Sequence, residues 1–450
     1  MTARKRARRV DTERISAEER ELRWIEGGDP VVQPAQPAWT TGAAAGAAPA
    51  RLILAVVVLI ITGVSLACGD ARRLAARPFE RQADRMRTRL NFREFVGNMT
   101  EKEFSRYYRI PRARAAGNAS SSPQSFEELV AAITPPAHEL ARQQARARHT
   151  TGGYVGHELR VSMALRYLAG GSYLDIMYLH GVGRTCFYRY LWPTLDAIDK
   201  ALPEFSLEDD IHDLERCRHL AAGFARKTDG HIRGAVAALD GIIFKVERPA
   251  VINNEEVVNP NKFNCRKGFP GVSCQAACDA DRRITFLAID FAASVHDSRA
   301  FRIARTSRGT RMSDELSTST VLRQRADTPE LRSRLRSHPY GFFLLADDAY
   351  AASDTMCVPW VSVRGKPYRD SFNHQQSRGR INIECAFGML TRKFLVLSRP
   401  MMMSIPRLRT TVRAAAKLHN LCVGPDGASR ETGIYTTDFT GVRSCVGFGW

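Results

Sequence analysis

The stretch "GFFLLADDAYA" (residues 341–351) has the pattern of a buried strand that runs into two acidic residues, Asp347 and Asp348. A carboxylate at the end of a buried strand costs free energy unless it has a partner. Such an aspartate either caps a turn or holds a metal ion in a metal-dependent enzyme. The stretch alone allows both, so the choice depends on the residues that would surround it in the fold.

Strand and helix patterns around this stretch predict an α+β layered domain over residues 230–423. Strands are expected at 234–247, 271–281, 282–291 and 341–350, and helices at 294–306 and 379–397. The first three strands should be antiparallel, with a turn near 280–282. The last helix should be buried on one side, because Ile383, Phe387, Leu390 and Phe394 share a face.

The region before this domain, residues 72–215, is predicted to be helical. Within it, "SYLDIMYLHG" (172–181), the turn "VGRT" (182–185) and "CFYRYLWPTLDAI" (186–198) have a helix-turn-helix-like pattern. An ordinary helical hairpin explains the same pattern. The net charge of +19, from 66 Lys+Arg against 47 Asp+Glu, favours a polyanionic partner such as DNA. The residues expected to contact DNA from the second helix are Arg184, Thr185, Tyr188 and Arg189.

The two ends of the chain are predicted to be tails, at residues 1–71 and 424–450. "RKRARR" (4–9) is typical of a nuclear-localisation signal or a phosphate-binding patch, and equally of a solvated tail. The apolar segment 52–68 has 17 residues, fewer than the roughly 20 of a usual membrane span, so a membrane anchor is not favoured but stays open. The acidic run "LEDDIHDLE" (207–215) is interpreted as a solvated connector.

The ten cysteines are scattered along the chain and contain no C-x-x-C pair. This spacing argues against a zinc finger or ribbon and favours buried free thiols. It also fits a reducing intracellular compartment.

Three acidic residues of the α+β domain are expected to converge: Asp240 in the first strand, Asp347 at the end of the fourth, and Glu384 on the last helix. In a ribonuclease-H-like sheet the first strand and the strand after the first helix are neighbours, which would bring Asp240 and Asp347 within metal-bridging distance. Converging carboxylates repel one another unless cations lie between them. Two divalent ions about 3.5–4 Å apart would remove that repulsion and activate water for attack on a phosphodiester. Oxygen ligands select Mg²⁺ or Mn²⁺ rather than zinc.

A series of motifs in this domain resembles the PIF/Harbinger transposase family, which includes the domesticated Harbinger transposase-derived nucleases of eukaryotes. The resemblance covers roughly residues 125–422. The segments occur in the family's order: "ALDGIIFKVERP" (238–249), "NCRKGFPGVSCQAACDAD" (264–281), "ASVHDSRAF" (293–301), "LLADDAY" (344–350), "GRINIECAFGMLTRKFLVL" (379–397) and "AAAKLHNLC" (414–422).

The resemblance implies a ribonuclease-H-like DDE endonuclease fold with Asp240, Asp347 and Glu384 as the catalytic triad. It also implies a metal-site role for Asp297, for which an N-terminal helix cap is the alternative. It further implies a nuclear protein that acts on DNA with Mg²⁺ or Mn²⁺ and is assisted by a Myb-like DNA-binding protein. Four basic residues would face phosphates or stay solvated: Arg266, Lys267, Arg378 and Arg380.

The chain departs from the family pattern near its acids. "DGII" (240–243) lacks the Thr and His that usually follow the first aspartate, and "ASVHDS" and "DDAY" replace "GS-HDS" and "DSGY". All three acids are retained. Two functions therefore stay open: a metal-dependent DNA endonuclease or transposase, and a domesticated DNA-binding protein that keeps the fold without cutting.

Overall fold

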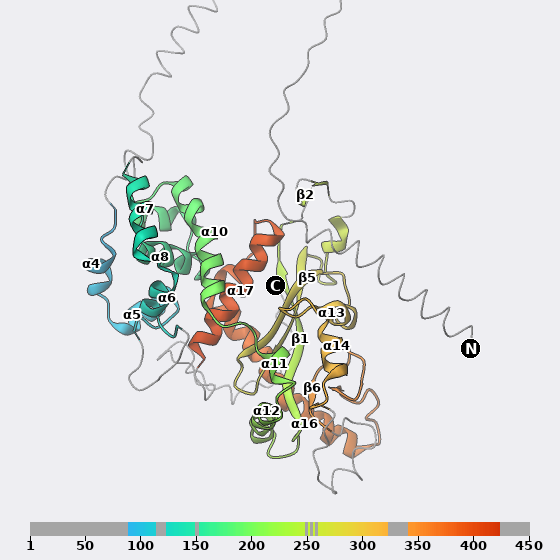
Figure 1. The fold of residues 1–450 in the computed structure, drawn as a ribbon. Helices are drawn as coiled ribbons and strands as arrows, with labels where there is room; N and C mark the ends of the chain where they lie inside the picture. The colour runs from blue at the N-terminus through green and yellow to red at the C-terminus, as the bar shows by residue number, and fades with distance from the viewer. Residues whose placement is uncertain are drawn as a thin grey trace, which may run out of the picture.

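A computed structural model describes residues 89–113, 123–148, 153–247, 251–252, 255–256, 260–322 and 341–423. These residues form a helical region followed by a layered α/β region, and the C-terminal helix α17 (Ile405–Cys422) lies between the two (Figure 1). The predicted tails at 1–71 and 424–450, including the apolar segment 52–68, lie outside the described residues. None of the helices within the described ranges is long and apolar enough to cross a membrane.

Within the residues that the structure describes, the helical region contains seven helices that pack around aromatic and aliphatic side chains. Its core includes Phe104, Tyr108, Leu129 and Met163, all fully buried. Local sequence fixes several helix starts: Thr100 and Glu103 form a capping box. The helices are α4 (Phe92–Gly97), α5 (Glu101–Tyr108), α6 (Phe126–Ile133), α7 (Ala137–Ala147), α8 (His157–Leu168), α9 (Tyr173–His180) and α10 (Arg184–Ala201).

The predicted pair of helices joined by a tight turn is confirmed as α9 and α10. Gly181 ends α9 with φ 62°, a left-handed conformation that glycine adopts without steric cost. Gly183 is the N-cap of α10, and the turn between the helices is therefore very short. A buried hydrogen-bond chain fixes α9 on α8, because Ser162 Oγ lies 3.0 Å from Tyr108 Oη and 2.7 Å from His180 Nε2.

The layered region is built on a five-stranded mixed sheet with the order β5-β4-β1-β6-β7. The pairs β1–β4 and β4–β5 are antiparallel, whereas β1–β6 and β6–β7 are parallel. The predicted neighbourhood of the first strand and the strand after the first helix is thus confirmed. The strands are β1 (Ala235–Lys245), β4 (Gly271–Cys278), β5 (Ile284–Ala292), β6 (Phe343–Leu345) and β7 (Met356–Cys357), with a separate ribbon of β2 (Val251–Ile252) and β3 (Glu255–Glu256).

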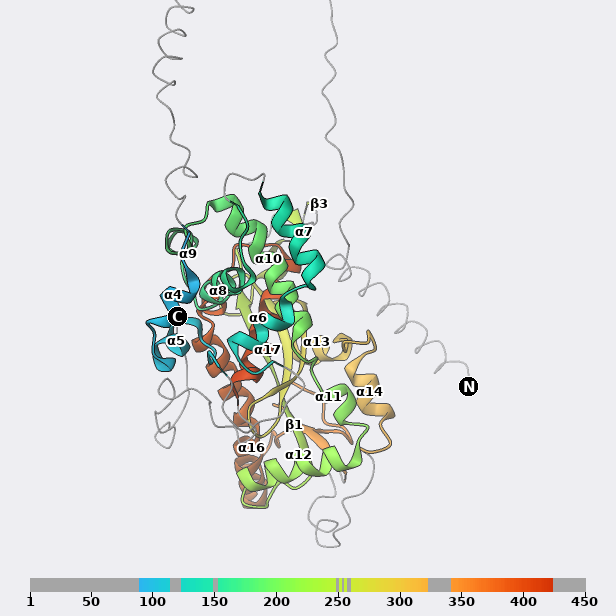
Figure 2. The ribbon, with the colours of Figure 1, turned by 60° about the vertical axis from the view of Figure 1, so that its left-hand side comes forward.

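Helices cover both faces of this sheet. The helices α11 (Leu207–Asp210), α13 (Asp297–Ile303) and α14 (Met312–Thr318) share one apolar cluster with Val236 and Leu239 of β1. On the opposite face α16 (Pro367–Lys393) and α17 share another with Ala238 and Phe244. The helix α12 (Leu214–Lys227) runs beside α16 at one end of the sheet (Figure 2), and short 3-10 turns occur at Pro260–Phe263 and Leu395–Ser398.

Two expectations about this region are wrong. Residues 207–215 are not a solvated connector, because they contain α11 and the start of α12, and Glu208 is buried. The Glu208 carboxylate accepts hydrogen bonds from Thr306 Oγ1 and Ser307 Oγ, both at 2.9 Å, which offsets its burial. The long helix α16 also begins twelve residues before the expected position 379. Its predicted apolar face is confirmed, since Ile383, Leu390 and Phe394 are fully buried.

Candidate active site

Asp240 lies near the middle of β1, where it pairs with Ala276 of β4 and follows Ala238, the last residue of β1 that pairs with β6, by two positions. Its Oδ1 accepts a hydrogen bond of 2.8 Å from the backbone N–H of Gly241, and its side chain is 20% exposed. Burial, and to a smaller extent the negative charges of Asp347 and Glu384, raises the pKa of Asp240 to about 7, although the Gly241 N–H and Arg380 oppose the rise. The charged form of this carboxylate is therefore short of compensating positive charge.

Asp347 follows β6 rather than ending it, and the predicted strand at 341–350 is wrong in length. β6 comprises three residues, and Asp347 Oδ1 accepts a hydrogen bond of 3.0 Å from Ala349 N, which turns the chain and ends strand pairing. Burial raises the pKa of Asp347, with smaller contributions from Asp297 and Asp348. Because β6 is the parallel neighbour of β1, the carboxylate lies at the same end of the sheet as Asp240.

Glu384 is presented by α16 together with Arg380, one helical turn before it. Arg380 Nη1 lies 2.5 Å from Glu384 Oε1 and 3.5 Å from Asp240 Oδ2, so a single guanidinium nitrogen contacts both acids. The side chains of Arg380 and Asp240 are each about one fifth exposed. The positive charge of Arg380 thus takes the space between two of the three predicted catalytic acids.

Asp297 approaches the sheet from the other face. It is the first residue of α13, whose N-cap is His296, so the alternative role of Asp297 as a helix cap is wrong. Its Oδ1 accepts a hydrogen bond of 3.0 Å from Gln275 Nε2, and Gln275 Oε1 accepts one of 2.5 Å from the Tyr350 hydroxyl. A Cβ atom at Gly241 would collide with the Asp297 carboxylate, so only glycine allows this approach next to Asp240.

The four acids share one end of the sheet but do not form a ready metal site. Burial raises the pKa of the Tyr350 hydroxyl, and so do the negative charges of Asp240, Asp297 and Asp347. Yet within the described part of the chain no three His, Cys, Asp or Glu side chains are grouped closely enough to hold a metal ion. The expected approach of Asp240, Asp347 and Glu384 to metal-bridging distance is not met by the described side chains. Carboxylate oxygens fit Mg²⁺ or Mn²⁺ by kind and charge, provided that the Arg380 guanidinium moves.

The residues predicted to contact DNA are either paired within the protein or exposed. Arg378 donates a hydrogen bond to Asp229 Oδ2 at 2.6 Å, so it is paired on the protein surface. Arg380 is paired within the acid cluster, the name used here for Asp240, Asp297, Asp347 and Glu384. Of the others, Tyr188 is half-buried against Tyr173, with ring centroids 6.0 Å apart. The remaining five residues are exposed, on α10 and at a turn that follows Cys265: Arg184, Thr185, Arg189, Arg266 and Lys267.

Sequence reasoning missed Gln275, Tyr350 and the bridging role of Arg380. Spacing could have indicated the last, because Arg380 and Glu384 are four residues apart on a helix. The sequence signal for Gln275 is that it is polar within the otherwise largely apolar stretch "GVSCQAAC" (271–278). Cys265, Cys274 and Cys278 are buried free thiols, as predicted.

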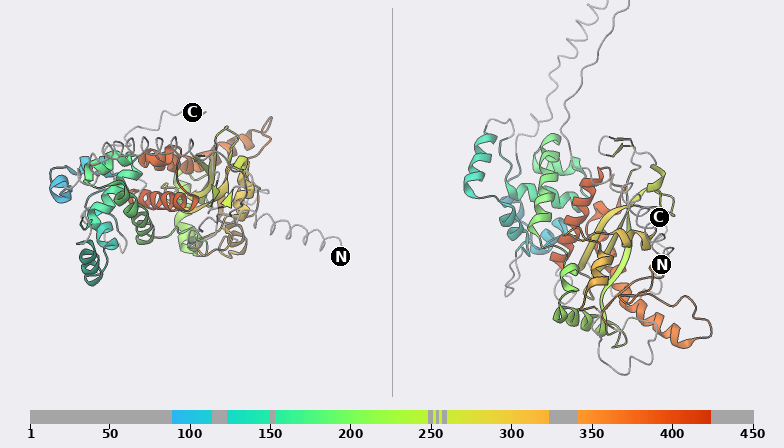
Figure 3. Two further views of the ribbon diagram at one scale, coloured as in Figure 1. Left: turned by 90° about the horizontal axis from the view of Figure 1, so that it is seen from above. Right: turned by 45° about the vertical axis from the view of Figure 1, so that its right-hand side comes forward.

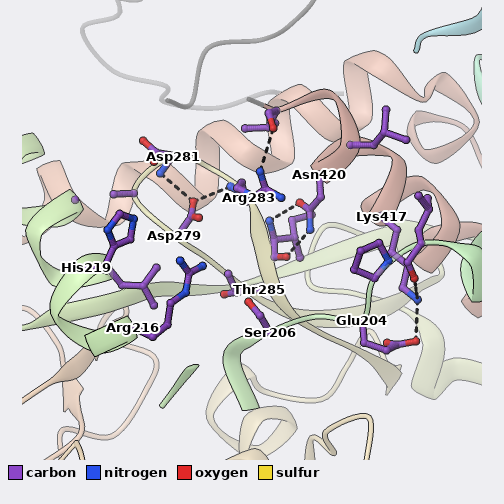
Figure 4. Close-up of a pocket in the computed structure, with 18 of the residues that line it drawn as sticks. Glu204, Ser206, Arg216, His219, Asp279, Asp281, Arg283, Thr285, Lys417 and Asn420 are labelled. Atoms are coloured by element: carbon purple, nitrogen blue, oxygen red, sulfur yellow. Dashed lines mark hydrogen bonds and ion pairs between the residues drawn. The ribbon is translucent and has the colours of Figure 1, made fainter. Parts of the chain in front are cut away.

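A cavity of about 430 Å³ lies between the helical region and the sheet (Figure 4), and none of the four acids lines it. Two of its charged side chains hold the two regions together, because Lys417 Nζ lies 2.8 Å from Glu204 Oε1, and also 2.9 Å from Asp199 Oδ1. Burial raises the pKa of Asp279, another lining residue, to about 6. The cavity is therefore distinct from the site that contains the four acids.

Comparison with known proteins identifies the family that the layered region resembles. No curated protein and no solved structure shows significant similarity to this chain. Residues 239–420, from β1 to α17, match the sequence model of a family described as DDE superfamily endonuclease. The matched residues include Asp240, Asp347 and Glu384. The part of the chain that contains the acid cluster is thus similar to a DDE superfamily endonuclease domain.

Proposed function

We propose that this chain is a divalent-metal-dependent DNA endonuclease of the Harbinger transposase type, which hydrolyses phosphodiester bonds with Asp240, Asp347 and Glu384. One observation carries the proposal: the neighbouring strands β1 and β6 and the helix α16 bring these three acids to one end of the sheet, inside the matched region. The strand order β5-β4-β1-β6-β7, with three antiparallel strands followed by two parallel ones, supports a ribonuclease-H-like fold.

The acids would hold Mg²⁺ or Mn²⁺, and Asp297 would add a carboxylate from the opposite face of β1. When bound, such ions supply Lewis acidity and a water of lowered pKa for in-line attack on phosphorus. The chain's own residues position the ligands. Gly241 N–H orients Asp240, Ala349 N–H orients Asp347, and the Tyr350–Gln275 pair orients Asp297. Arg380 balances the negative charge while the acids hold no cation.

DNA would be bound mainly through α10 and the exposed turn after Cys265. Arg184, Thr185 and Arg189 lie exposed at the start of α10, as a helix that enters a DNA groove requires. Arg266 and Lys267 would contact phosphates. A nuclear location and a Myb-like accessory protein follow from the family resemblance and belong to the same proposal.

The second candidate function is a DNA-binding protein that keeps this fold but does not cut. The Arg380 bridge favours it, because a guanidinium between Asp240 and Glu384 stabilises the acids without a metal ion. The "DGII" segment after the first acid favours it as well.

Nicking of supercoiled plasmid DNA separates the two functions. We expect wild-type protein to nick in Mg²⁺ or Mn²⁺ and not in EDTA, and Asp240→Asn to lose nicking while binding DNA. Asp281→Asn, an aspartate in the turn between β4 and β5, is the matched control and should nick like wild type. Wild-type protein that binds DNA but never nicks it, with the accessory protein supplied, would support the second function.

A further inference from the structure

The loop between β7 and α16, together with the first turn of α16, exposes aromatic and basic side chains. Val361 is 89% exposed and Tyr368 is 65% exposed, although both are large apolar residues. Arg364 and Lys366 lie between them and are exposed. Residues 357–369 contain no acidic side chain, and one acid, Asp370, follows them in the first turn of α16. Apolar and positively charged surface is therefore concentrated in one short segment.

This segment is held in a defined shape. The Arg369 guanidinium lies 4.2 Å from the centre of the Trp360 ring and 5.8 Å from that of Tyr368. Arg369 Nη1 also donates to Ser362 O at 3.0 Å. The Asn373 side chain accepts from Trp360 N at 2.8 Å and donates to Trp360 O at 2.9 Å. These contacts fix Trp360, Arg369 and Tyr368, which are called here the aromatic–cation platform. The Tyr368 ring nevertheless stays exposed.

The platform lies on the helix that also carries Glu384. The start of α16 and the loop before it project away from the helical region (Figure 3, right). At about 100° per residue, Asn373, which holds the platform, shares a face of α16 with Arg380 and Glu384. Fifteen residues separate Arg369 from Glu384, about 22 Å of helix at 1.5 Å per residue. A DNA strand that rises 3.4 Å per nucleotide covers that distance in about six nucleotides.

We propose that the aromatic–cation platform binds unpaired nucleotides of a DNA strand that extends from the acid cluster, with one base stacked on Tyr368. Aromatic rings stack on any base, and nearby cations bind the backbone, which together make a site for single-stranded nucleic acid. Arg364 and Lys366 would pair with the phosphates on either side of the stacked base. Three cations of the segment, Arg364, Lys366 and Arg369, outnumber its one acid, Asp370, and this net positive charge favours the polyanion over an apolar protein surface. The path of the DNA strand from the acid cluster to the platform rests on the proposed function. Binding of the strand to the platform does not require cleavage.

The test measures DNA binding by the full-length protein in EDTA, using fluorescence anisotropy. One probe is a duplex with a single-stranded extension of about six or more nucleotides, and the other is the same duplex with blunt ends. We expect wild-type protein to prefer the extended duplex. Tyr368→Leu, which keeps apolar bulk but cannot stack, should lose about tenfold in affinity for the extended duplex and none for the blunt one. Tyr368→Trp should retain the preference. Met402→Ala, at a residue 77% exposed elsewhere, is the control.

Three results would overturn the inference: equal affinity of wild type for the two probes, an unchanged preference in Tyr368→Leu, or equal losses on both probes. Sedimentation of the same variants adds a fourth, because a change of oligomeric state in Tyr368→Leu would identify the platform as a protein contact. Failure of the nuclease proposal would be seen separately, as absence of nicking in Mg²⁺ by a protein that still prefers the extended duplex.

Discussion

Arg380→Gln tests whether Arg380 and a metal ion compete for the same acids. The substitution removes the charge that lies between Asp240 and Glu384 but keeps a polar side chain of similar length. The contact with Glu384 at 2.5 Å is an ion pair, and removing one partner of a fully buried pair costs about 3–5 kcal/mol. The Glu384 side chain is 39% exposed, and solvent screening reduces that value. We therefore expect Arg380→Gln to lower the free energy of unfolding in EDTA by about 1–2 kcal/mol.

Metal binding should change in the opposite direction. If the Arg380 guanidinium must leave before Mg²⁺ binds, the free energy needed to break its contacts with Asp240 and Glu384 weakens Mg²⁺ binding by wild-type protein. The variant has no such contacts to break. A bridge of about 1–2 kcal/mol corresponds to about 5- to 30-fold tighter Mg²⁺ binding by Arg380→Gln. Mg²⁺ should also raise the stability of the variant by more than it raises that of wild type.

Isothermal calorimetry and urea denaturation, each with and without Mg²⁺, measure both quantities. The matched control is Arg378→Gln, two residues away on α16, where the arginine pairs with a largely exposed Asp229. It should leave stability and metal affinity nearly unchanged. Equal or weaker Mg²⁺ binding by Arg380→Gln would refute the competition and leave Arg380 as a structural counter-ion.

Three further predictions concern the acids, the buried histidines and the junction between the two regions. Asp347→Asn should bind DNA and lose Mg²⁺-dependent nicking by about a thousandfold or more, whereas exposed Asp348→Asn should nick like wild type; equal nicking by both variants would contradict the assignment. Burial lowers the pKa of His180 to about 4, so the unfolded state takes up a proton first as the pH falls from 6.5. As the pH falls from 6.5 to 4, the free energy of unfolding of wild-type protein should therefore decrease by up to about 1.4 kcal/mol per pH unit relative to that of His180→Gln. A difference in the free energy of unfolding between the two proteins, measured by urea denaturation, that stays the same at all pH values would contradict this. The comparison with the variant cancels the opposite trend from Asp240 and Asp279, whose pKa values are raised. Lys417→Met should lower the free energy of unfolding by about 3 kcal/mol, because it leaves Asp199 and Glu204 with one cation, Arg413, in place of two; a loss below that of an exposed lysine would argue against this role.

Periodicity predicted the elements that bury a regular face. The pair α9 and α10, the strands β1, β4 and β5, and the buried face of α16 lie where apolar spacing indicated. Charge misled the interpretation of residues 207–215, because the partners that offset the burial of Glu208 lie about a hundred residues away in the sequence: Thr306, Ser307 and Arg308. The first half of α16 was missed because its sequence "PYRDSFNHQQSRGR" (367–380) is polar and the helix there projects from the domain.

The candidate site was predictable in its residues more than in its arrangement. Strand order follows from the fold, so the neighbourhood of Asp240 and Asp347 could be inferred from the order of elements. The position of Arg380 depends on the phase of α16 relative to β1, which no local pattern fixes. The contact of Asp297 with Gly241 likewise depends on where α13 meets the sheet. The glycine at position 241 is the sequence feature that reflects this contact.

The charge balance of the acid cluster bears on the choice between cutting and non-cutting functions. Asp240 and Glu384 share one guanidinium, while Asp297 and Asp347 are hydrogen-bonded by the neutral groups Gln275 Nε2 and Ala349 N–H. Burial and the mutual repulsion of the acids raise the pKa of Asp240 despite Arg380. If Arg380 were the only cation that the acid cluster ever contacts, replacing some of the four acids by neutral residues would increase the stability of the fold. The remaining negative charge is what a divalent cation would neutralise, and this favours metal binding beside Asp240, near the middle of β1, over a purely structural cluster.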